Sequence, residues 1–548
     1  MGRKRTRAPF FGLFRHEITD CEPGRSVGAG SFKSTGGNDR FVALVRVPRG
    51  PSNALAFRGI SQPSSVLRRM QDTADRIVSE RARVAVPAVG QALCRPLATL
   101  GGEVGAIVLI VPLLLALALW NGFPFIFYDT GAYVLEGLGH VFLAERSPVY
   151  SLFLDYTDAS TSLWFVVSIQ SLIVAFTIVE TLRAVAPGTS LAWAVGIGLA
   201  LVSLTSLPWF VGEIEPDCFT GTTVLSLYLL VFRREAVAGW REDALLCGVV
   251  LSMAAHPSHL LLGLGLSVLT VGYWALRRLL HAKDWPRAAI LRPLMGCTFS
   301  VLLVVAANYD LTGKIFISRS GPAFLFARLL QDGIVMRLLD DTCAEAHYRL
   351  CYYKDDLPRT ADQWLWNTSS PFFAMNKFTG TSAESTRIIW DSIWRYPFMH
   401  VVAATNDTLR QFAMFRTGDQ IEPQEWVLSP SLKRFLPSQM ESYLTARQQR
   451  GEIDFRPINI VHVGVAWLSL AGLTEALVFM VRTRRRDIGA FLAFVLIALI
   501  GNAVVCGTLS NPHNRYQSRL IWLAPFALAA LAGDRARFAL RGVAESGS

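Results

Sequence analysis

The chain has 548 residues, of which 52% are hydrophobic and only 17% are charged. Charge is scarce for a soluble protein, and the apolar residues form long blocks of roughly 17–25, each long enough to cross a bilayer as a helix. These blocks lack the alternation of a membrane β-barrel. The composition therefore predicts an all-α polytopic membrane protein and excludes an ordinary soluble enzyme.

Nearly all of the net charge of +11 lies in residues 1–100. This segment is rich in Gly, Ser, Pro and Arg, which predicts a largely disordered tail attracted to anionic lipid. It lacks the interleaved aromatics of a nucleic-acid-binding module, so we expect no nucleic-acid partner.

About ten apolar segments are predicted to cross the membrane, in a first block at 101–307 and a second at 457–548. The fifth segment is short, and it could be tilted, re-entrant or merged with the sixth around Pro257. The ten segments are 104–120, 162–182, 190–210, 217–232, 244–256, 259–276, 288–307, 457–481, 488–506 and 519–533.

The basic loops between these segments all fall on one side, which the positive-inside rule makes cytoplasmic, together with both termini. The remaining polar loops then lie on the outer face of the cytoplasmic membrane. The long segment 308–456 becomes a mixed extracytoplasmic domain, with helical patterns at 383–396 and 398–415. Cys343 and Cys351 lie in this segment, where an oxidising compartment would allow a disulfide between them.

The first outer loop, 121–160, contains Asp129 between Phe127, Tyr128 and Tyr133. Aromatic neighbours partly desolvate a carboxylate, which makes it a better general base. Further along the loop, Arg146 and Tyr150 flank Pro148. They are either interfacial anchors or contacts to a phosphate or sugar.

Three carboxylates, Glu213, Glu215 and Asp217, fall within five residues at the outer ends of two segments. Asp217 could cap the helix that follows. The three could instead hold a divalent cation, Mg or Mn, through hard oxygen ligands. No cofactor is certain from the sequence.

Two further outer turns carry ionisable residues. His256 and His259 are either buried structural histidines or contacts to a phosphate. Arg515 and Arg519, four residues apart beside Tyr516, would share a helix face suited to an anionic lipid phosphate.

With these motifs the chain resembles the GT-C superfamily of membrane glycosyltransferases, such as the protein O-mannosyltransferases and the aminoarabinose transferase of lipid A. The resemblance covers roughly 101–310 and 457–533. Asp129-Thr130 stands where the mannosyltransferases have paired acidic residues. The matching elements are Asp129 with Tyr133, Arg146 with Pro148 and Tyr150, Pro216 with Asp217, and Arg515 with Tyr516.

The resemblance implies a GT-C-like helical bundle in which Asp129 is the base and a polyprenyl-phosphate sugar is the donor, used at the outer membrane face. The acceptor would be a lipid, a polysaccharide or a protein. Two other readings remain open: a polysaccharide polymerase or ligase with two lipid-pyrophosphate sites, and a non-enzymatic transporter of lipid-linked glycans.

Overall fold

The computed structural model of the chain describes residues 97, 99–280 and 288–533, and the predicted basic tail lies almost entirely outside them. The described residues are helical, with one isolated parallel bridge between Phe125 and Glu213 and no β-strand. The prediction of an all-α membrane protein is confirmed at this level, because six helices are long and apolar enough to cross a membrane.

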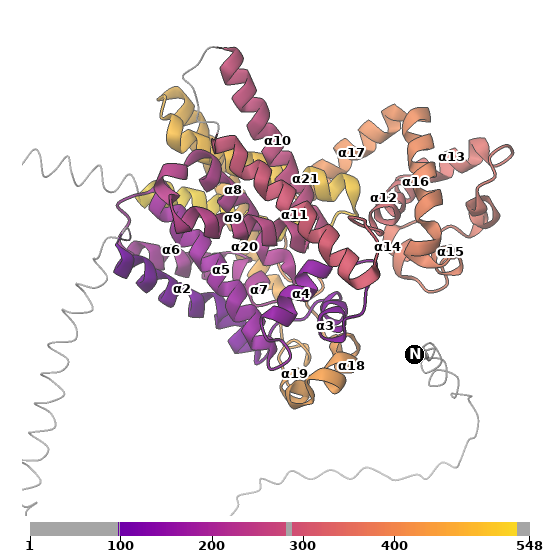
Figure 1. The fold of residues 1–548 in the computed structure, drawn as a ribbon, viewed down its shortest axis with the longest axis horizontal. Helices are drawn as coiled ribbons and strands as arrows, with labels where there is room; N and C mark the ends of the chain where they lie inside the picture. The colour runs from indigo at the N-terminus through magenta and orange to yellow at the C-terminus, as the bar shows by residue number, and fades with distance from the viewer. Residues whose placement is uncertain (1–96, 98, 281–287, 534–548) are drawn as a thin grey trace, which may run out of the picture. The chain divides into compact units, whose positions relative to one another are not determined.

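The first block contains long apolar helices together with several short ones (Figure 1), and it contains four of the six candidate spans. Its elements are α2 (Leu100–Asn121), α3 (Thr130–Gly139), α4 (Pro148–Tyr156), α5 (Leu163–Val185), α6 (Leu191–Leu204), α7 (Leu207–Val211), η1 (Pro216–Cys218), α8 (Phe219–Phe232), η2 (Arg234–Val237), α9 (Trp240–Ala255), α10 (Pro257–Leu279) and α11 (Ala288–Thr312).

Local chemistry sets the ends of these helices. The Thr99 hydroxyl accepts a hydrogen bond from the Gly102 amide at the start of α2, and Gly122 ends the helix in the left-handed region at φ 88°. The Ser162 side chain caps α5 in the same way as Thr99 caps α2. Because backbone groups cannot meet water inside a bilayer, such caps belong at the membrane surfaces.

One predicted segment differs from the observed helices, and the structure decides between the alternatives for the fifth and sixth segments. The segment 190–210 is interrupted between α6 and α7, where Thr205 and Ser206 leave the helical path and the Ser206 hydroxyl donates to the Ser518 carbonyl at 2.5 Å. The fifth and sixth segments are separate helices, because His256 is extended (φ −148°, ψ 137°) between α9 and α10.

The long segment after α11 consists of helices and η turns joined by loops, and it contains no β-strand. Helices at the predicted positions 383–396 and 398–415 are present as α16 and α17. The elements are α12 (Gly321–Gln331), α13 (Ile334–Thr342), η3 (Arg349–Asp356), α14 (Ala361–Trp366), α15 (Pro371–Ala374), α16 (Lys377–Arg395), α17 (Pro397–Phe412), α18 (Glu425–Phe435), η4 (Pro437–Gln439) and α19 (Met440–Leu444).

This segment contributes to two cores. Helices α12 to α16 bury their own cluster, centred on Phe326, Trp364 and Phe372. Helix α18 instead packs on α3, and its Leu428 and Leu432 join the main core of the membrane block. The second part of the segment therefore covers the first loop.

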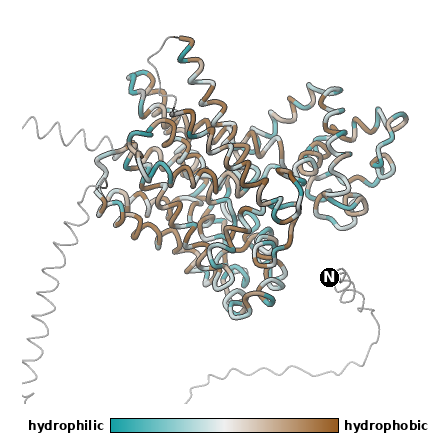
Figure 2. Tube along the Cα trace, viewed as in Figure 1, coloured by the Kyte–Doolittle hydropathy of each residue, from teal (hydrophilic) through white to brown (hydrophobic). Residues whose placement is uncertain are grey.

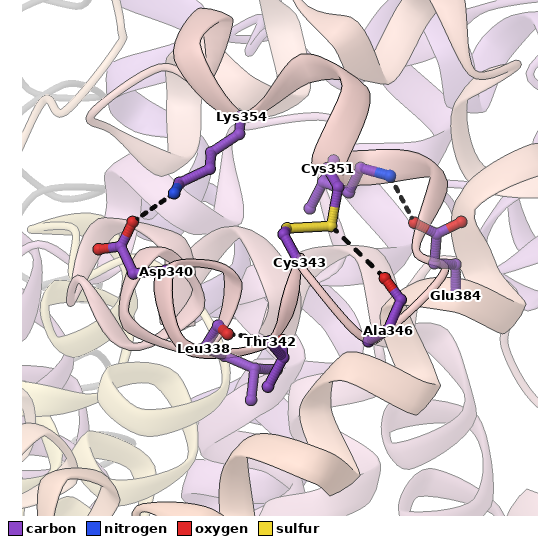
Figure 3. Close-up of a disulfide and its surroundings, with 9 residues drawn as sticks. Leu338, Asp340, Thr342, Cys343, Ala346, Cys351, Lys354 and Glu384 are labelled. Carbon is purple, nitrogen blue, oxygen red and sulfur yellow. Dashed lines mark hydrogen bonds and ion pairs between the residues drawn. A yellow bond between two sulfur atoms is a disulfide. The ribbon is translucent and has the colours of Figure 1, made fainter.

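The prediction of a disulfide between Cys343 and Cys351 is confirmed, with their Cα atoms 5.7 Å apart (Figure 3). It ties the end of α13 to η3, where Lys354 pairs with Asp340 at 2.6 Å.

The last block contains α20 (Phe455–Arg482), α21 (Arg486–Leu509) and α22 (Arg515–Ile521), and the chain is helical again over 523–533. Helices α20 and α21 are the other two candidate spans. Figure 2 shows the apolar character that runs along the long helices of both blocks.

Candidate functional site

The loop after α2 lies beside the loop after α7. The Phe125 amide donates to the Gly212 carbonyl at 2.8 Å, and the Ile214 amide donates to the Phe125 carbonyl at 3.0 Å. The Thr130 hydroxyl adds a bond to the Ile214 carbonyl at 3.1 Å. These bonds bring the predicted Asp129 motif next to the predicted carboxylate motif.

Asp129 directly precedes α3, and Arg146 lies just before α4. The Arg146 guanidinium donates to Oδ1 of Asp129. Arg146 is largely buried, whereas the Asp129 side chain keeps 20% of its surface exposed. The Arg146 guanidinium also faces the Trp366 ring at 5.9 Å, which links the loop to the long segment.

Asp217, in η1, is fully buried between two arginines of α22. The Arg515 Nε lies 2.9 Å from Oδ2 of Asp217, and Arg519 Nη1 lies 2.6 Å from Oδ1. Each carboxylate oxygen thus accepts from a different guanidinium, an arrangement of strong charge-assisted bonds.

Arg515 joins the two halves of the site. Its Nη1 lies 3.9 Å from Oδ2 of Asp129, and its Nη2 lies 3.7 Å from Oε2 of Glu215. The guanidinium stacks over the Phe127 ring at 3.8 Å. Asp129, Arg146, Glu215, Asp217, Arg515 and Arg519 therefore form one contiguous group, called here the site cluster.

Glu215 is the unusual member of the site cluster. It is fully buried, and neither of its carboxylate oxygens has a hydrogen-bond partner among the described residues. Burial, reinforced by the nearby Asp129 charge, raises the pKa of Glu215 well above its usual range. Three arginines face Asp129 and Asp217, the two carboxylates that accept hydrogen bonds from them.

Glu213 also lies beside the cluster. Burial raises its pKa to about 8, against the opposing pull of Arg515. Its backbone carbonyl accepts from the Gln170 side chain at 2.9 Å.

The prediction of a divalent cation held by Glu213, Glu215 and Asp217 is not borne out. Over the described ranges, no group of three or more His, Cys, Asp or Glu side chains is arranged to hold a metal ion. The reason is that Arg515 and Arg519 supply the positive charges that neutralise Asp217.

The two histidines lie in the turn between α9 and α10. His259 is buried, with Nε2 2.6 Å from the Thr220 hydroxyl and Nδ1 3.1 Å from the Ser252 carbonyl. The His256 side chain accepts from the Ser258 amide and so caps α10. The Ser258 hydroxyl in turn accepts from Arg519 at 2.8 Å. This geometry favours the structural reading of both histidines.

Of the three predicted site tyrosines, Tyr133 and Tyr150 are buried and Tyr516 is partly buried. Tyr133 and Tyr150 pack edge to face with ring centroids 4.8 Å apart, and the Tyr150 hydroxyl donates to Gln170 at 2.6 Å. The guanidinium carbon of Arg519 lies over the Tyr516 ring, 5.2 Å from the centroid of that ring. All three tyrosines pack next to the site cluster.

Several site residues were missed by sequence reasoning. Asn502 of α21 lies 3.4 Å from Arg519, and Asp419 accepts from the Arg515 amide at 3.2 Å. A polar Asn inside an apolar span is a signal that could have been used. Ser258 and Trp366 carry no comparable signal, because their roles depend on tertiary packing.

The arrangement provides one partly exposed carboxylate beside three arginines whose guanidiniums face aromatic rings. It can accept a proton at Asp129 and attract an anion next to it. No protein-family model, no curated protein and no solved structure matches the chain.

Proposed function

We propose that the chain is an integral membrane glycosyltransferase of the GT-C type. It moves a sugar from a polyprenyl-phosphate donor to a lipid, polysaccharide or protein acceptor at the outer face of the cytoplasmic membrane. About ten crossings, with both termini cytoplasmic, accord with the basic loops opposite the site. The donor arrives within the bilayer, so the site belongs at a membrane surface.

The observation that carries the proposal is the contact of Asp129 with Arg146 and Arg515, which come from separate parts of the chain. Among the carboxylates of the site cluster, Asp129 alone has an exposed face, while Glu215 and Asp217 have none. A carboxylate that binds substrate must be reachable, so the base role falls to Asp129.

In the proposed reaction the acceptor oxygen attacks the anomeric carbon of the donor. The bond between that carbon and the phosphate oxygen breaks, and the electron pair leaves with the lipid phosphate. Asp129 takes the acceptor proton. Arg146 and Arg515 stabilise the negative charge that grows on the departing phosphate.

Arg519 has a different part in this scheme. Its side chain is fully buried and held by Asp217 and Ser258, which is the position of a residue that orients its neighbours. We therefore assign Arg519, His256, His259 and Tyr150 to positioning, and the direct phosphate contact to Arg146 and Arg515.

The test compares cells that have and lack the gene, by mass analysis of lipids, glycans and proteins. A single-sugar mass difference on one of these classes is expected, and it identifies the acceptor. Asp129→Asn is expected to lower product formation by about 10²–10⁴-fold at normal protein level.

The controls distinguish the alternatives. Asp158→Asn changes an exposed carboxylate in the neighbouring turn and is expected to leave product formation unchanged. Normal product from the Asp129→Asn variant would refute the base assignment. A complete lipid-linked glycan that accumulates without its last transfer step would instead favour a transporter or a polymerase.

A further inference from the structure

Helix α17 buries polar side chains and exposes apolar ones, which is the reverse of a helix in a water-soluble protein. Its buried side chains include Asp407, which accepts from the buried Arg328, and Gln411, which bonds the His513 backbone at 2.8 Å and 3.0 Å. Its opposite face exposes Phe398, Val402 and Leu409. These three lie at spacings of four and seven residues, so they form a single stripe.

This helix packs along α21, which is a candidate membrane span. The approach is close, because a Cβ at Gly507 would lie 2.6 Å from the Asp407 carbonyl oxygen. Small residues at such contacts are typical of helix pairs in membranes. Helix α21 exposes apolar side chains of its own, at Ile497, Ile500 and Val504.

The preceding helix continues the exposed apolar surface. Trp390 and Trp394 lie four residues apart on one face of α16, and both are exposed, Trp394 by 80%. Phe398, exposed by 77%, follows at the start of α17. Tryptophan is enriched at the headgroup level of membranes, where its ring is apolar and its N–H can meet water.

From these features we infer that the exposed face of α16 and α17 lies in the lipid of the membrane leaflet on the side of the site. The apolar stripe of α17 contacts acyl chains, and Trp390 and Trp394 lie among the headgroups. The polar side chains of α17 have their partners inside the protein. Asp407 pairs with Arg328, and Gln411 bonds the His513 backbone in the loop before α22. Of the surfaces that could cover this face, lipid is favoured because α17 runs alongside a span whose own outer face is apolar.

Lipid contact at this face has a structural consequence that does not depend on the proposed reaction. Helices α16 and α17 then hold α12 to α15, which pack on α16 and on one another, against the membrane surface. Through Trp366, these helices contact Arg146 of the site cluster.

Photocrosslinking of the full chain tests this inference. p-Benzoylphenylalanine is placed at Phe398 or Trp394, and the protein is reconstituted in vesicles of phosphatidylethanolamine and phosphatidylglycerol. Tyr352, an aromatic residue of the same segment that is 94% exposed, is the matched control. Val504 of α21 serves as the reference for lipid contact.

Lipid adducts, counted by mass spectrometry, are expected at Phe398 and Trp394 at a yield close to that of Val504. The yield at Tyr352 is expected to be about tenfold lower, because this residue belongs to η3, a polar turn that also holds Lys354, Asp355 and Asp356. Equal yields at Tyr352 and Phe398 would overturn the inference. So would chain-to-chain crosslinks from Phe398, which would show that a second copy covers the face.

Discussion

Among the residues that the structure describes, a buried group of carboxylates and arginines lies at each end of α2. The site cluster follows the end of that helix. The second group, called here the opposite cluster, consists of Glu103, Glu180, Arg183 and Arg241 and lies near its start. A helix of 22 residues spans roughly 33 Å, so the two groups are separated by about a membrane thickness.

The opposite cluster is fully paired. Glu180 accepts from Arg183 at 2.6 Å and from Arg241 at 3.0 Å, and Glu103 contacts both arginines as well. Within the part of the chain that the structure describes, no buried nitrogen or oxygen of these four side chains lacks a hydrogen-bond partner. Two charges of each sign cancel, and the group ties α2, α5 and α9 together.

The hydrogen bonding of the site cluster, by contrast, is incomplete. Both oxygens of Glu215 and the Nε atoms of Arg146 and Arg519 are buried, and no described residue forms a hydrogen bond with them. Unpaired buried polar groups destabilise a fold, so they persist where something other than stability selects them. The difference indicates that the opposite cluster holds helices together, while the site cluster keeps capacity for a ligand.

The sharpest test of this comparison removes one central carboxylate from each cluster. Asp217→Asn leaves Arg515 and Arg519 buried without full compensation, and Glu180→Gln does the same to Arg183 and Arg241. Each is expected to lower the free energy of unfolding by about 3–5 kcal/mol. Thermal unfolding in detergent measures the loss.

The two variants should differ in activity. Transfer per folded molecule is expected to collapse in Asp217→Asn and to stay at the wild-type level in Glu180→Gln. If both variants lose activity equally once the folded fraction is corrected, the functional contrast between the clusters is wrong.

A second test uses pH. Because burial raises the pKa of Glu213 to about 8, the folded chain keeps this proton over a range in which the unfolded chain, near 4.5, has released it. The fold therefore loses stability as pH rises from about 4.5 to 8, by at most about 1.4 kcal/mol per pH unit from this group.

Glu213→Gln is expected to reduce that slope, since the amide does not titrate. Unfolding midpoints measured from pH 5 to 8 provide the comparison with wild type. Glu215 titrates in the same direction, so a Glu213→Gln/Glu215→Gln double variant should be flatter still. If the dependence of stability on pH is unchanged in the double variant, the groups that cause it lie outside the site.

Much of this arrangement could be predicted from the sequence. Length and hydropathy indicate the long helices, because only helices satisfy their own backbone within a bilayer. The basic loops placed Asp129, Asp217 and Arg515 on a common face, and the structure brings these residues into one cluster. The interruption after Leu204 was missed, although Ser206 before Pro208 is a recognisable helix start.

The pairing inside the cluster could not be predicted. The sequence does not show that Arg519 faces Asp217 instead of an open lipid surface, or that His259 is enclosed by Thr220 and Ser252. Such roles depend on which side chains the tertiary fold buries. The same limit applies to α17, whose stripe is visible in the sequence but whose burial of Asp407 is not.

The smallest expected effect concerns Tyr150, for which anchoring and substrate contact were even alternatives. Its hydroxyl is buried and bonded to Gln170, which in turn holds the Val211 and Glu213 carbonyls at 3.1 Å and 2.9 Å. Tyr150→Phe leaves one acceptor of Gln170 unpaired and is expected to cost about 1 kcal/mol of stability. Transfer per folded molecule should change little.

Tyr443→Phe is the matched control, because this buried tyrosine donates to the Gln424 carbonyl at 2.7 Å without touching the site cluster. The two variants should lose similar stability and keep similar activity, as measured by unfolding midpoints and initial rates. A rate that falls only in Tyr150→Phe would mean that its hydroxyl reaches the reacting groups. In that case Tyr150 would belong to the residues that act on the substrate, and not to those that only hold the site cluster in place, as its bond to Gln170 indicates.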